Sequence, residues 1–390
     1  MSKNILMIAY TNYSTDARVI KEAETAIKNG FQVDFIALKE EGKNLTEKIN
    51  GVNLFKINQY QYKGKSYIRH LLSYMKFFLK CTIKTIILYI TNKYKIIHVN
   101  NMPDFLVFCA LVPKLCGSKI ILDIHDHMPA ILLTNSNSKF NNIKYRLLLF
   151  QEKLSSQFAD SIITVHDPIK NDILIKDGIP GNKITVITNF ADDTLFTTNG
   201  NYSLNSPLKL IFHGTISDRT ALEDILKAIK NTTNTHKLQF KILGKGNFGN
   251  RLKQLINEFN LETIVDYEDK FYDYKKLPDI IKTYHLGIAS YVYSVATDYM
   301  LPVKMLEYIL LGIPFITIPN KAIKYFLTGD ECFFYNPVNI SSLTDVLDNI
   351  IKNPYSILEK REKLIATREK FLWSNEQIKY VNHLHHLINR

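Results

Sequence analysis

Short apolar runs of strand length alternate with longer amphipathic stretches along most of the chain. Residues 4–9 and 32–38 are mostly apolar runs, and residues 16–29 between them repeat apolar positions at helical spacing up to Gly30. Strands that are apolar at every position, rather than at every second one, are typical of a parallel sheet covered on both faces. Further strands of this kind are expected at residues 52–57, 95–99, 119–124, 161–165 and 183–187. The first half of the chain therefore predicts a doubly wound α/β unit.

A polar segment rich in Asn, Asp, Ser and Thr at residues 189–207 predicts a linker, and the alternation then begins again. In this second half, strands are expected at residues 209–213, 237–243, 264–267, 286–290, 315–318 and 332–335. The predicted organisation is a first doubly wound domain at 1–190, a linker at 191–207, a second such domain at 208–372 and a final helix at 373–390. Ligands of doubly wound sheets bind outside the carboxyl ends of the strands, so two such domains predict a cleft.

The composition is that of a globular protein in a reducing compartment. At 390 residues the chain is long enough for two cores. Its contents of 46% hydrophobic and 22% charged residues are ordinary for a globular protein. The four cysteines have no metal-binding or redox spacing, which suits a cytosolic protein with small buried thiols. The apolar start of the chain is too short for a signal peptide, and no uncharged apolar run reaches the roughly 18 residues of a membrane-spanning helix. We therefore expect a protein that does not cross a membrane.

The formal net charge of +12 is concentrated in one part of the chain. Residues 48–103 contain ten Lys and Arg residues and no acidic one. Spacings of seven, four and four residues predict one basic stripe along an apolar-rich helix, formed by Arg69, Lys76, Lys80 and Lys84. Such a helix is typical of a protein at an anionic membrane surface. A solvated domain helix and a nucleic-acid partner are the alternatives, and we expect no nucleic acid because no known reading module accompanies the stripe.

Residues 301–314 contain the most informative local pattern. Pro302 suits the first turn of a helix, and Gly312 suits a left-handed residue that closes it. Lys304 and Glu307 are three residues apart and therefore lie on one face of this helix. The N–H groups at the helix start and the Lys304 charge would attract phosphate, while the Glu307 carboxylate could accept hydrogen bonds from two sugar hydroxyls. A diphosphate beside a ribose indicates a nucleotide sugar as the ligand. The alternative interpretation of residues 301–314 is an ordinary buried helix without a ligand.

The run reads Leu-Pro-x-Lys-x-x-Glu-Tyr-x-x-x-Gly-x-Pro and resembles the donor loop of family 4 retaining glycosyltransferases, which have the GT-B fold. Further segments resemble this family in the same order and spacing, at residues 16–23, 123–126, 152–165, 187–190 and 213–216. The commoner family pattern has an acidic residue where Tyr299 stands, with Asp298 next to it. The resemblance implies two Rossmann-like domains facing a central cleft, with a C-terminal helix that crosses back to the first domain. The helical pattern of residues 341–390 is equally compatible with a helix that covers the second domain.

Asp123, His125, Asp126 and His127 lie where the strand at 119–124 runs into a loop. The residues allow three interpretations. Asp123, His125 and His127 would share one face of a continued strand and could bind a metal, or a histidine could bond a neighbouring backbone group in the core. The resemblance implies the third interpretation, an active-site His125 near the sugar and the acceptor, with Asp126 beside it.

Gly214 follows the first strand of the second domain and resembles the family's glycine at this point. Thr215 replaces a basic residue that usually follows this glycine, and the resemblance implies that Arg219 fills a second basic position near the phosphates. Residues 244–249 match Gly-x-Gly-x-x-Gly. This match has three interpretations: a glycine-rich turn near the donor with Lys245 lining the cleft, a dinucleotide-binding fold, or a plain tight turn.

The resemblance as a whole implies a retaining glycosyltransferase, and the cysteines and the basic stripe predict that it is cytoplasmic and peripheral on the inner face of the cell membrane. It would move a sugar from a nucleoside diphosphate sugar, with UDP-sugars favoured, to a hydroxyl of a lipid-linked saccharide in surface polysaccharide biosynthesis. No metal or other cofactor is expected, because cationic side chains and a helix start can neutralise the leaving diphosphate. The implied donor-site residues are Gly214, Arg219, Lys245, Pro302, Val303, Lys304 and Glu307. A nucleotide-sugar epimerase of the same architecture and a noncatalytic sugar- or lipid-binding protein are the alternative functions.

Overall fold

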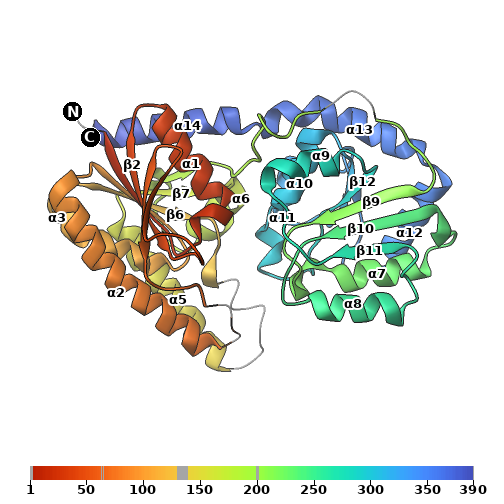
Figure 1. Cartoon of the computed structure of the whole chain (residues 1–390), viewed down its shortest axis with the longest axis horizontal. Coiled ribbons are helices and arrows are strands. Elements are labelled where there is room, and N and C mark those ends of the chain that lie inside the picture. Colours follow the sequence, from red (N-terminus) through yellow and green to blue (C-terminus); the bar gives the residue numbers. More distant parts are fainter. Residues whose placement is uncertain (1–2, 63, 65, 130–138, 199–201, 390) are drawn as a thin grey trace. The chain divides into compact units, whose positions relative to one another are not determined.

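The computed structural model describes residues 3–62, 64, 66–129, 139–198 and 202–389, with the backbone alone for residues 139–142. The chain forms two compact units (Figure 1). The first consists of Met1–Asn189 together with Asn375–Arg390, and the second consists of Phe190–Ser374. Each unit is built around its own β-sheet.

The first unit has an eight-stranded sheet with the order β3-β4-β2-β1-β5-β6-β7-β8. Its strands are β1 Asn4–Ile8, β2 Gln32–Leu38, β3 Thr46–Ile49, β4 Val52–Ile57, β5 Ile96–Asn100, β6 Lys119–Ile124, β7 Ser161–Thr164 and β8 Ile184–Val186. Within the described residues, neighbouring strands are parallel except for β3 with β4. Strands β1, β5 and β6 are buried along almost their whole length, as their continuous apolar runs predicted. The strand order changes direction between β1 and β5, and ligands of doubly wound sheets bind at such switch points.

Strand β3 was not predicted from the hydrophobic pattern. Its residues Thr-Glu-Lys-Ile are polar for the most part and half-exposed or exposed, as suits the edge of a sheet. The hairpin from β3 to β4 turns through Asn50 and Gly51, whose φ angles are 50° and 90°. Two positive φ angles are those of a type I′ turn, for which Asn-Gly is the strongest sequence signal. The signal for this hairpin was therefore present in the turn rather than in the strand.

Helices cover both faces of the first sheet, and two of them share one layer. The helices are α1 Ala17–Lys28, α2 Tyr67–Asn92, α3 Leu111–Leu115, α5 Lys139–Phe158 and α6 Asp167–Ile169. The short 3-10 helix η2 (Asp104–Ala110) packs against both α2 and α5. The Phe78 ring of α2 lies 5.7 Å from the Phe105 ring, and the Phe108 ring lies 5.0 Å from the Phe158 ring of α5. Because η2 contacts both helices, α2 and α5 lie on the same side of the sheet.

The last helix, α14 (Trp373–Ile388), packs on the first unit. The Tyr380 hydroxyl lies 3.0 Å from Nδ1 of His98 in β5. The Glu376 carboxylate accepts a hydrogen bond from the backbone N–H of Thr188 at 3.0 Å. The chain thus returns to the first unit at its end, as the resemblance implies, rather than covering the second.

The second unit has a six-stranded parallel sheet with the order β11-β10-β9-β12-β13-β14. Its strands are β9 Leu208–His213, β10 Leu238–Leu243, β11 Val265–Glu268, β12 Leu286–Ile288, β13 Phe315–Thr317 and β14 Phe333–Phe334. Its helices are α7 Leu222–Asn231, α8 Gly249–Glu258, α9 Leu277–Ile281, α10 Val303–Leu311, α11 Lys321–Phe326, α12 Ile340–Lys352 and α13 Tyr355–Thr367. The order changes direction between β9 and β12, so the carboxyl ends of these two strands form the second switch point.

The segment predicted as a linker, residues 191–207, packs on the second unit where it is described, while residues 199–201 lie outside the described part. The Phe190 ring, just before this segment, lies 5.5 Å from the Phe371 ring. Phe196 is fully buried, with its ring 5.2 Å from that of Tyr274. These aromatic side chains anchor a segment whose overall composition is polar.

Candidate active site

The predicted donor helix is α10, which starts at the switch point of the second sheet. Pro302 is extended, with φ −65° and ψ 122°, and its carbonyl accepts the N–H of Met305 at 3.0 Å. The proline therefore stands just before the helix rather than in its first turn, and the N–H groups of Val303 and Lys304 lie ahead of the first helical hydrogen bond. Gly312 closes the helix with φ 65° and ψ 34°, which confirms its predicted left-handed conformation.

Lys304 is buried, and its ammonium group lies under the loop that follows β9. Its Nζ is 3.6 Å from the centroid of the Phe212 ring, and a Cβ atom placed on Gly214 would be 3.8 Å from the same Nζ. Burial lowers the pKa of Lys304 to about 7, although the nearby Glu307 carboxylate acts in the opposite direction. A cation that is held this poorly solvated is stabilised by any anion that binds beside it.

Glu307 is buried one turn further along α10 and is approached by a histidine that the sequence analysis did not select. His213, the last residue of β9, has its Nε2 atom 3.2 Å from Oε2 of Glu307. Burial and the Lys304 charge lower the pKa of His213 to about 3, so its ring is neutral at pH 7. The ring packs edge-on against Tyr308 with centroids 5.3 Å apart. The position of His213 at the carboxyl end of a central strand is the sequence signal from which its place at the site could have been predicted.

The glycines at 244 and 246 let the loops after β9 and β10 pack closely together. A Cβ atom on Gly244 would lie 1.8 Å from the carbonyl oxygen of Gly214, and one on Gly246 would lie 1.9 Å from that of Ile216. The backbone N–H of Ile216 also donates to the carbonyl of Lys245 at 3.2 Å. The Gly-x-Gly-x-x-Gly match therefore has a packing explanation, and it leaves the Lys245 side chain exposed next to the loop of Gly214.

Arg219 lies on the short 3-10 helix η5 (Asp218–Thr220) and is exposed. Its carbonyl accepts the N–H of Val292 at 2.9 Å, which joins the loops after β9 and β12 at the switch point. The acidic candidate Asp298 is engaged elsewhere, because its Oδ1 atom accepts the backbone N–H of Lys321 at 3.1 Å. The Lys321 ammonium donates to the Tyr299 hydroxyl at 2.9 Å. Tyr299 and its neighbour Asp298 thus both contact Lys321 at the start of α11.

In the first unit, His125 and Asp126 directly follow β6 and are half-buried. The His125 backbone N–H donates to Oδ1 of Asn101 at 3.3 Å, and the Asn101 amide donates to the Asp126 carbonyl at 2.6 Å. Burial lowers the pKa of His125, and the Arg18 charge lowers it further. Its Nδ1 atom is buried without a hydrogen-bond partner among the described residues.

Asp123, His125 and His127 do not converge on one metal, which corrects that interpretation of the sequence. Asp123 lies in the core and accepts hydrogen bonds from the Arg18 guanidinium, with its Oδ2 atom 3.1 Å from Nε and 2.6 Å from Nη2. His127 instead faces α5. Successive side chains separate here because the chain leaves the strand after Ile124, so the alternation of a continued strand no longer applies.

Arg18, Asp123, Glu22 and His98 form a buried ionic cluster that joins α1, β5 and β6. His98 Nε2 lies 3.7 Å from Oδ2 of Asp123, and Arg18 Nε lies 3.4 Å from Oε1 of Glu22. Burial acts to raise the pKa of Asp123, but the charge of Arg18 and the hydrogen bond with His98 together outweigh it, and the pKa falls to about 2. Burial raises the pKa of Glu22 to about 7, and the Asp123 charge adds to that rise. The guanidinium therefore holds two carboxylates in the core of the first unit.

Arg18→Leu is expected to destabilise the first unit by about 3–5 kcal/mol, because it leaves Asp123 as an uncompensated buried charge. Urea unfolding followed by circular dichroism measures this loss. Arg251→Leu is the matched control, because Arg251 pairs with Glu258 at the surface and should contribute less than about 1 kcal/mol. Equal stabilities of the two variants would contradict a structural role for the Arg18 cluster.

Solved structures share this two-unit fold over their whole length. The chain matches sucrose-phosphate synthase from Thermosynechococcus elongatus with a TM-score of 0.78 and 14% identity, covering 99% of each chain. It matches Anabaena HepE in complex with UDP and glucose with a TM-score of 0.70 and 13% identity, covering 98% of this chain and 99% of the other. It matches the lipopolysaccharide outer core galactosyltransferase WaaB with a TM-score of 0.65 and 14% identity, covering 98% of each. At these identities the matches show the GT-B fold.

Two family models match successive parts of the sequence. Glycosyltransferase Family 4 matches residues 17–195, and Glycosyl transferases group 1 matches residues 201–371. The chain is a glycosyltransferase of the GT-B fold. No curated protein matches it in sequence. The second model includes α10 with Lys304 and Glu307, and the first includes His125 and Asp126.

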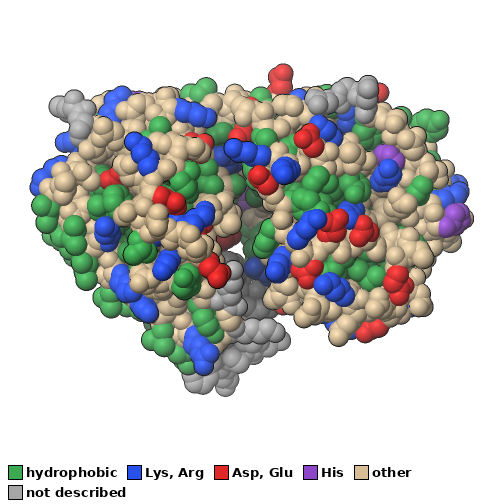
Figure 2. Space-filling view, viewed as in Figure 1, with side chains coloured by type: hydrophobic (Ala, Val, Ile, Leu, Met, Phe, Trp, Pro, Cys, Tyr) green, Lys and Arg blue, Asp and Glu red, His purple; other side chains and the backbone are tan. Residues whose placement is uncertain are grey.

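The basic stripe of the glycosyltransferase lies beside an exposed apolar face on α2. The helix buries Phe77, Cys81 and Leu88 against its unit. Its outward face exposes more than half of each of Ile68, Leu72, Leu79, Ile83, Ile87 and Ile90. Arg69 and Lys76 are exposed, whereas Lys80 and Lys84 are half-buried, and apolar and basic side chains alternate along this flank in Figure 2. Of the ten basic residues between 48 and 103, Lys63 and Lys65 lie outside the described residues. Among the helices that the structure describes, none is long and apolar enough to span a bilayer.

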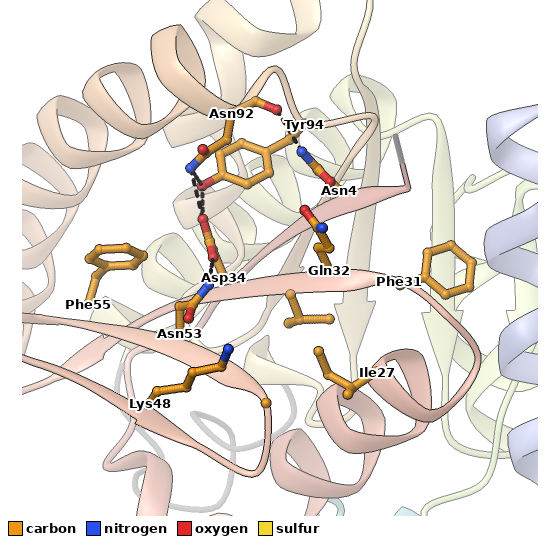
Figure 3. A pocket seen from close by; sticks show the side chains of 12 residues that line it. Asn4, Ile27, Phe31, Gln32, Asp34, Lys48, Asn53, Phe55, Asn92 and Tyr94 are labelled. Atoms are coloured by element: carbon orange, nitrogen blue, oxygen red, sulfur yellow. Dashed lines mark hydrogen bonds between the residues drawn. The ribbon is translucent and has the colours of Figure 1, made fainter. Parts of the chain in front are cut away.

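The first unit has a cavity of about 440 Å³ near the amino ends of β1 and β2, at the end of the sheet opposite to the carboxyl ends of these strands. Figure 3 shows Asp34 between Asn53 on one side and Asn92 and Tyr94 on the other. Asp34 accepts the Asn53 amide at 2.8 Å and the Asn92 amide at 2.9 Å, and it also accepts the Tyr94 hydroxyl. These polar groups bond to one another, and they lie away from the carboxyl ends of the strands. The cavity is therefore not part of the candidate active site.

Proposed function

We propose that the glycosyltransferase transfers a sugar from a UDP-sugar to a hydroxyl of a lipid-linked saccharide in surface polysaccharide biosynthesis, with retention of the anomeric configuration. The observation that carries this proposal is the buried Lys304 and Glu307 pair at the start of α10, beside the loop of Gly214. A nucleoside diphosphate supplies both an anion for the poorly solvated Lys304 ammonium and ribose hydroxyls that can donate hydrogen bonds to a fixed carboxylate. The solved HepE structure contains UDP and glucose, which supports the choice of uridine.

The leaving diphosphate would be held by Lys304, Arg219 and the N–H groups of Val303 and Lys304 that follow Pro302. These groups carry fixed positive charge at the place where negative charge develops during transfer. Lys245 is exposed on the neighbouring loop and would add a further cation. Glu307 would accept the ribose hydroxyls, with the neutral His213 ring positioning its carboxylate.

In the first unit, His125 would contact the transferred sugar or the acceptor, and Asp126 would lie beside it. Its buried Nδ1 atom, without a partner among the described residues, supports this role. The donor-side residues proposed above are assigned to the diphosphate and the ribose, so none of them is assigned as a nucleophile toward the sugar. We therefore propose that the acceptor hydroxyl attacks the sugar on the same face from which the diphosphate leaves. Positioning of the two substrates and stabilisation of the developing charge would lower the barrier to this step.

The acceptor would be anchored in a membrane that the glycosyltransferase binds from its cytoplasmic side. The helix α5 extends the apolar face of α2, because Ile143, Leu147 and Phe150 each expose 61% of their surface. The Lys144 ammonium lies 4.9 Å from the centroid of the Tyr67 ring, so the two helices are adjacent at this end. Apolar side chains flanked by Lys and Arg suit the boundary between acyl chains and anionic headgroups. The galactosyltransferase WaaB, which acts on lipopolysaccharide outer core by its name, supports a lipid-linked acceptor.

UDP is expected to stabilise the protein in the presence of EDTA, because cationic side chains rather than a metal would neutralise the diphosphate. At a hundredfold excess over its dissociation constant, UDP should raise the free energy of unfolding by about 2.7 kcal/mol. Denaturant unfolding with and without UDP measures this change. Stabilisation that appears only with added Mg²⁺ or Mn²⁺ would contradict a metal-free donor site.

Incubation of the protein with radiolabelled UDP-sugars and a bacterial lipid extract tests the proposed function. Label that moves into the organic phase supports transfer to a lipid-linked acceptor. Label that changes its sugar without leaving the nucleotide would identify an epimerase. Label that binds but stays unchanged with every lipid fraction would identify a noncatalytic binding protein.

A further inference from the structure

Four ionisable side chains from separate segments of the first unit meet beside the loop after β6. Asp104 comes from η2, His127 from the loop, Glu152 from α5, and Asp177 from the turn near Gly178. Asp104 and Glu152 expose only 1% of their surface, and His127 exposes 9%. One atom each of His127, Glu152 and Asp177 lies within 4.8 Å of the other two.

The distances in this cluster are long for hydrogen bonds and fit ligands of one cation. Nε2 of His127 lies 3.5 Å from Oε2 of Glu152 and 3.5 Å from Oδ2 of Asp177. Charge-assisted N–H···O bonds are typically about 2.7–2.9 Å long. Two ligand atoms about 2.1 Å from a tetrahedral Zn²⁺ are, by contrast, about 3.4 Å apart. Imidazole nitrogens and carboxylate oxygens are both ligand types that this ion takes in proteins.

The buried carboxylates of Glu152 and Asp104 have oxygen atoms without hydrogen-bond partners among the described residues, although Glu152 and Asp177 are each within ion-pair distance of His127. Neither oxygen of Glu152 has a hydrogen-bond partner among the described residues, and neither does Oδ2 of Asp104. The other oxygen of Asp104 accepts the Asn101 amide at 3.0 Å. Three carboxylates and one imidazole in this space have a deficit of positive charge that a divalent cation would remove.

We propose that His127, Glu152 and Asp177 bind one Zn²⁺ ion, with Asp104 next to it as a fourth oxygen donor or as the partner of a bound water. The site lies in the first unit, whereas α10 with the proposed donor-side residues Lys304 and Glu307 belongs to the second. The site connects the loop of His125 and Asp126 to η2 and α5. The bound ion therefore fixes the position of that loop, and it does not act on the diphosphate.

Zinc titration of the full chain tests this proposal after removal of metal with EDTA and dialysis. Isothermal titration calorimetry should show one Zn²⁺ site in the parent, and Glu152→Gln and Asp177→Asn should each weaken it by about 100-fold or more. Two variants are matched controls and should bind as the parent does: Glu258→Gln, which removes a surface carboxylate, and His385→Ala, which removes an imidazole from α14. Absence of stoichiometric binding to the parent, or loss of binding in His385→Ala alone, would overturn the proposal.

X-ray absorption of the zinc-loaded parent gives a second measurement that needs no variant, in case Glu152→Gln fails to fold. One imidazole nitrogen and two or three oxygens around zinc are expected. Sulfur ligation, or ligation by two imidazoles, would place the ion at a cysteine or at the histidines of α14 and would overturn the proposal.

Discussion

Lys304→Met is expected to weaken UDP binding by about 30-fold or more. The substitution keeps the length and apolar stem that pack on Phe212, but it removes the ammonium proposed to face the diphosphate. Removing one partner of a buried charge pair typically costs about 2–5 kcal/mol, which corresponds to at least 30-fold in the dissociation constant. Isothermal titration calorimetry measures the change. Uridine, which has no phosphate, is the control ligand and should bind parent and variant equally.

The pH dependence of UDP binding gives an independent test of the proposed contact between Lys304 and the diphosphate. Because the pKa of Lys304 is about 7 in the free protein, a growing fraction of the side chain is neutral above pH 7. Binding of the diphosphate then requires uptake of a proton, so the affinity of the parent should fall by up to about tenfold per pH unit above pH 7. His213, with a pKa of about 3, stays neutral throughout this range and adds no dependence. A parent affinity that is flat from pH 7 to 9, or a Lys304→Met variant that keeps the slope, would contradict the assignment.

Replacing Lys76, Lys80 and Lys84 with Gln is expected to weaken binding to anionic liposomes by about 100-fold. Each cation near such a surface contributes about 1 kcal/mol, so three account for about two decades in affinity. Glutamine keeps the helix propensity and much of the stem. Sedimentation with liposomes that contain phosphatidylserine measures the partition coefficient, and rising salt should weaken the parent in the same direction.

A matched variant separates the stripe from net charge alone. Lys352, Lys363 and Lys370 are exposed in the second unit, and their replacement with Gln removes the same number of charges. This control should sediment as the parent does. If the stripe variant also sediments as the parent does, the stripe is only a solvated face of α2.

The donor helix could be predicted from sequence because its signals are local. Pro302, Gly312 and the three-residue spacing from Lys304 to Glu307 all lie within one short run. The environment of these side chains could not be predicted in the same way. The ring under Lys304 and the histidine beside Glu307 come from β9, far away in the sequence, and only the packing of α10 against that strand brings them together.

The outward face of α2 shows why apolar composition alone does not place a helix. Apolar residues occur on several sides of this helix, so the sequence does not reveal which of them contact the domain. The structure buries Phe77 and Cys81 and exposes Ile83 and Ile87. The predicted linker shows that polar composition alone does not place a segment outside a domain either. Its composition predicted a connection between domains, but the buried Phe196 anchors it to the second unit.

The most direct test of the proposed donor site is a binding cycle between Glu307 and the ribose hydroxyls. UDP and 2′,3′-dideoxy-UDP are titrated calorimetrically into the parent and into Glu307→Gln, all in EDTA. Hydrogen bonds to a charged acceptor are worth about 1.5–3 kcal/mol, so the variant should bind UDP about 10- to 150-fold more weakly than the parent. The dideoxy nucleotide should bind both proteins equally, because it lacks the hydroxyls that Glu307 is proposed to accept. Equal losses for the two nucleotides, or no loss for either, would contradict a ribose contact by Glu307 and with it the proposed nucleotide-sugar site.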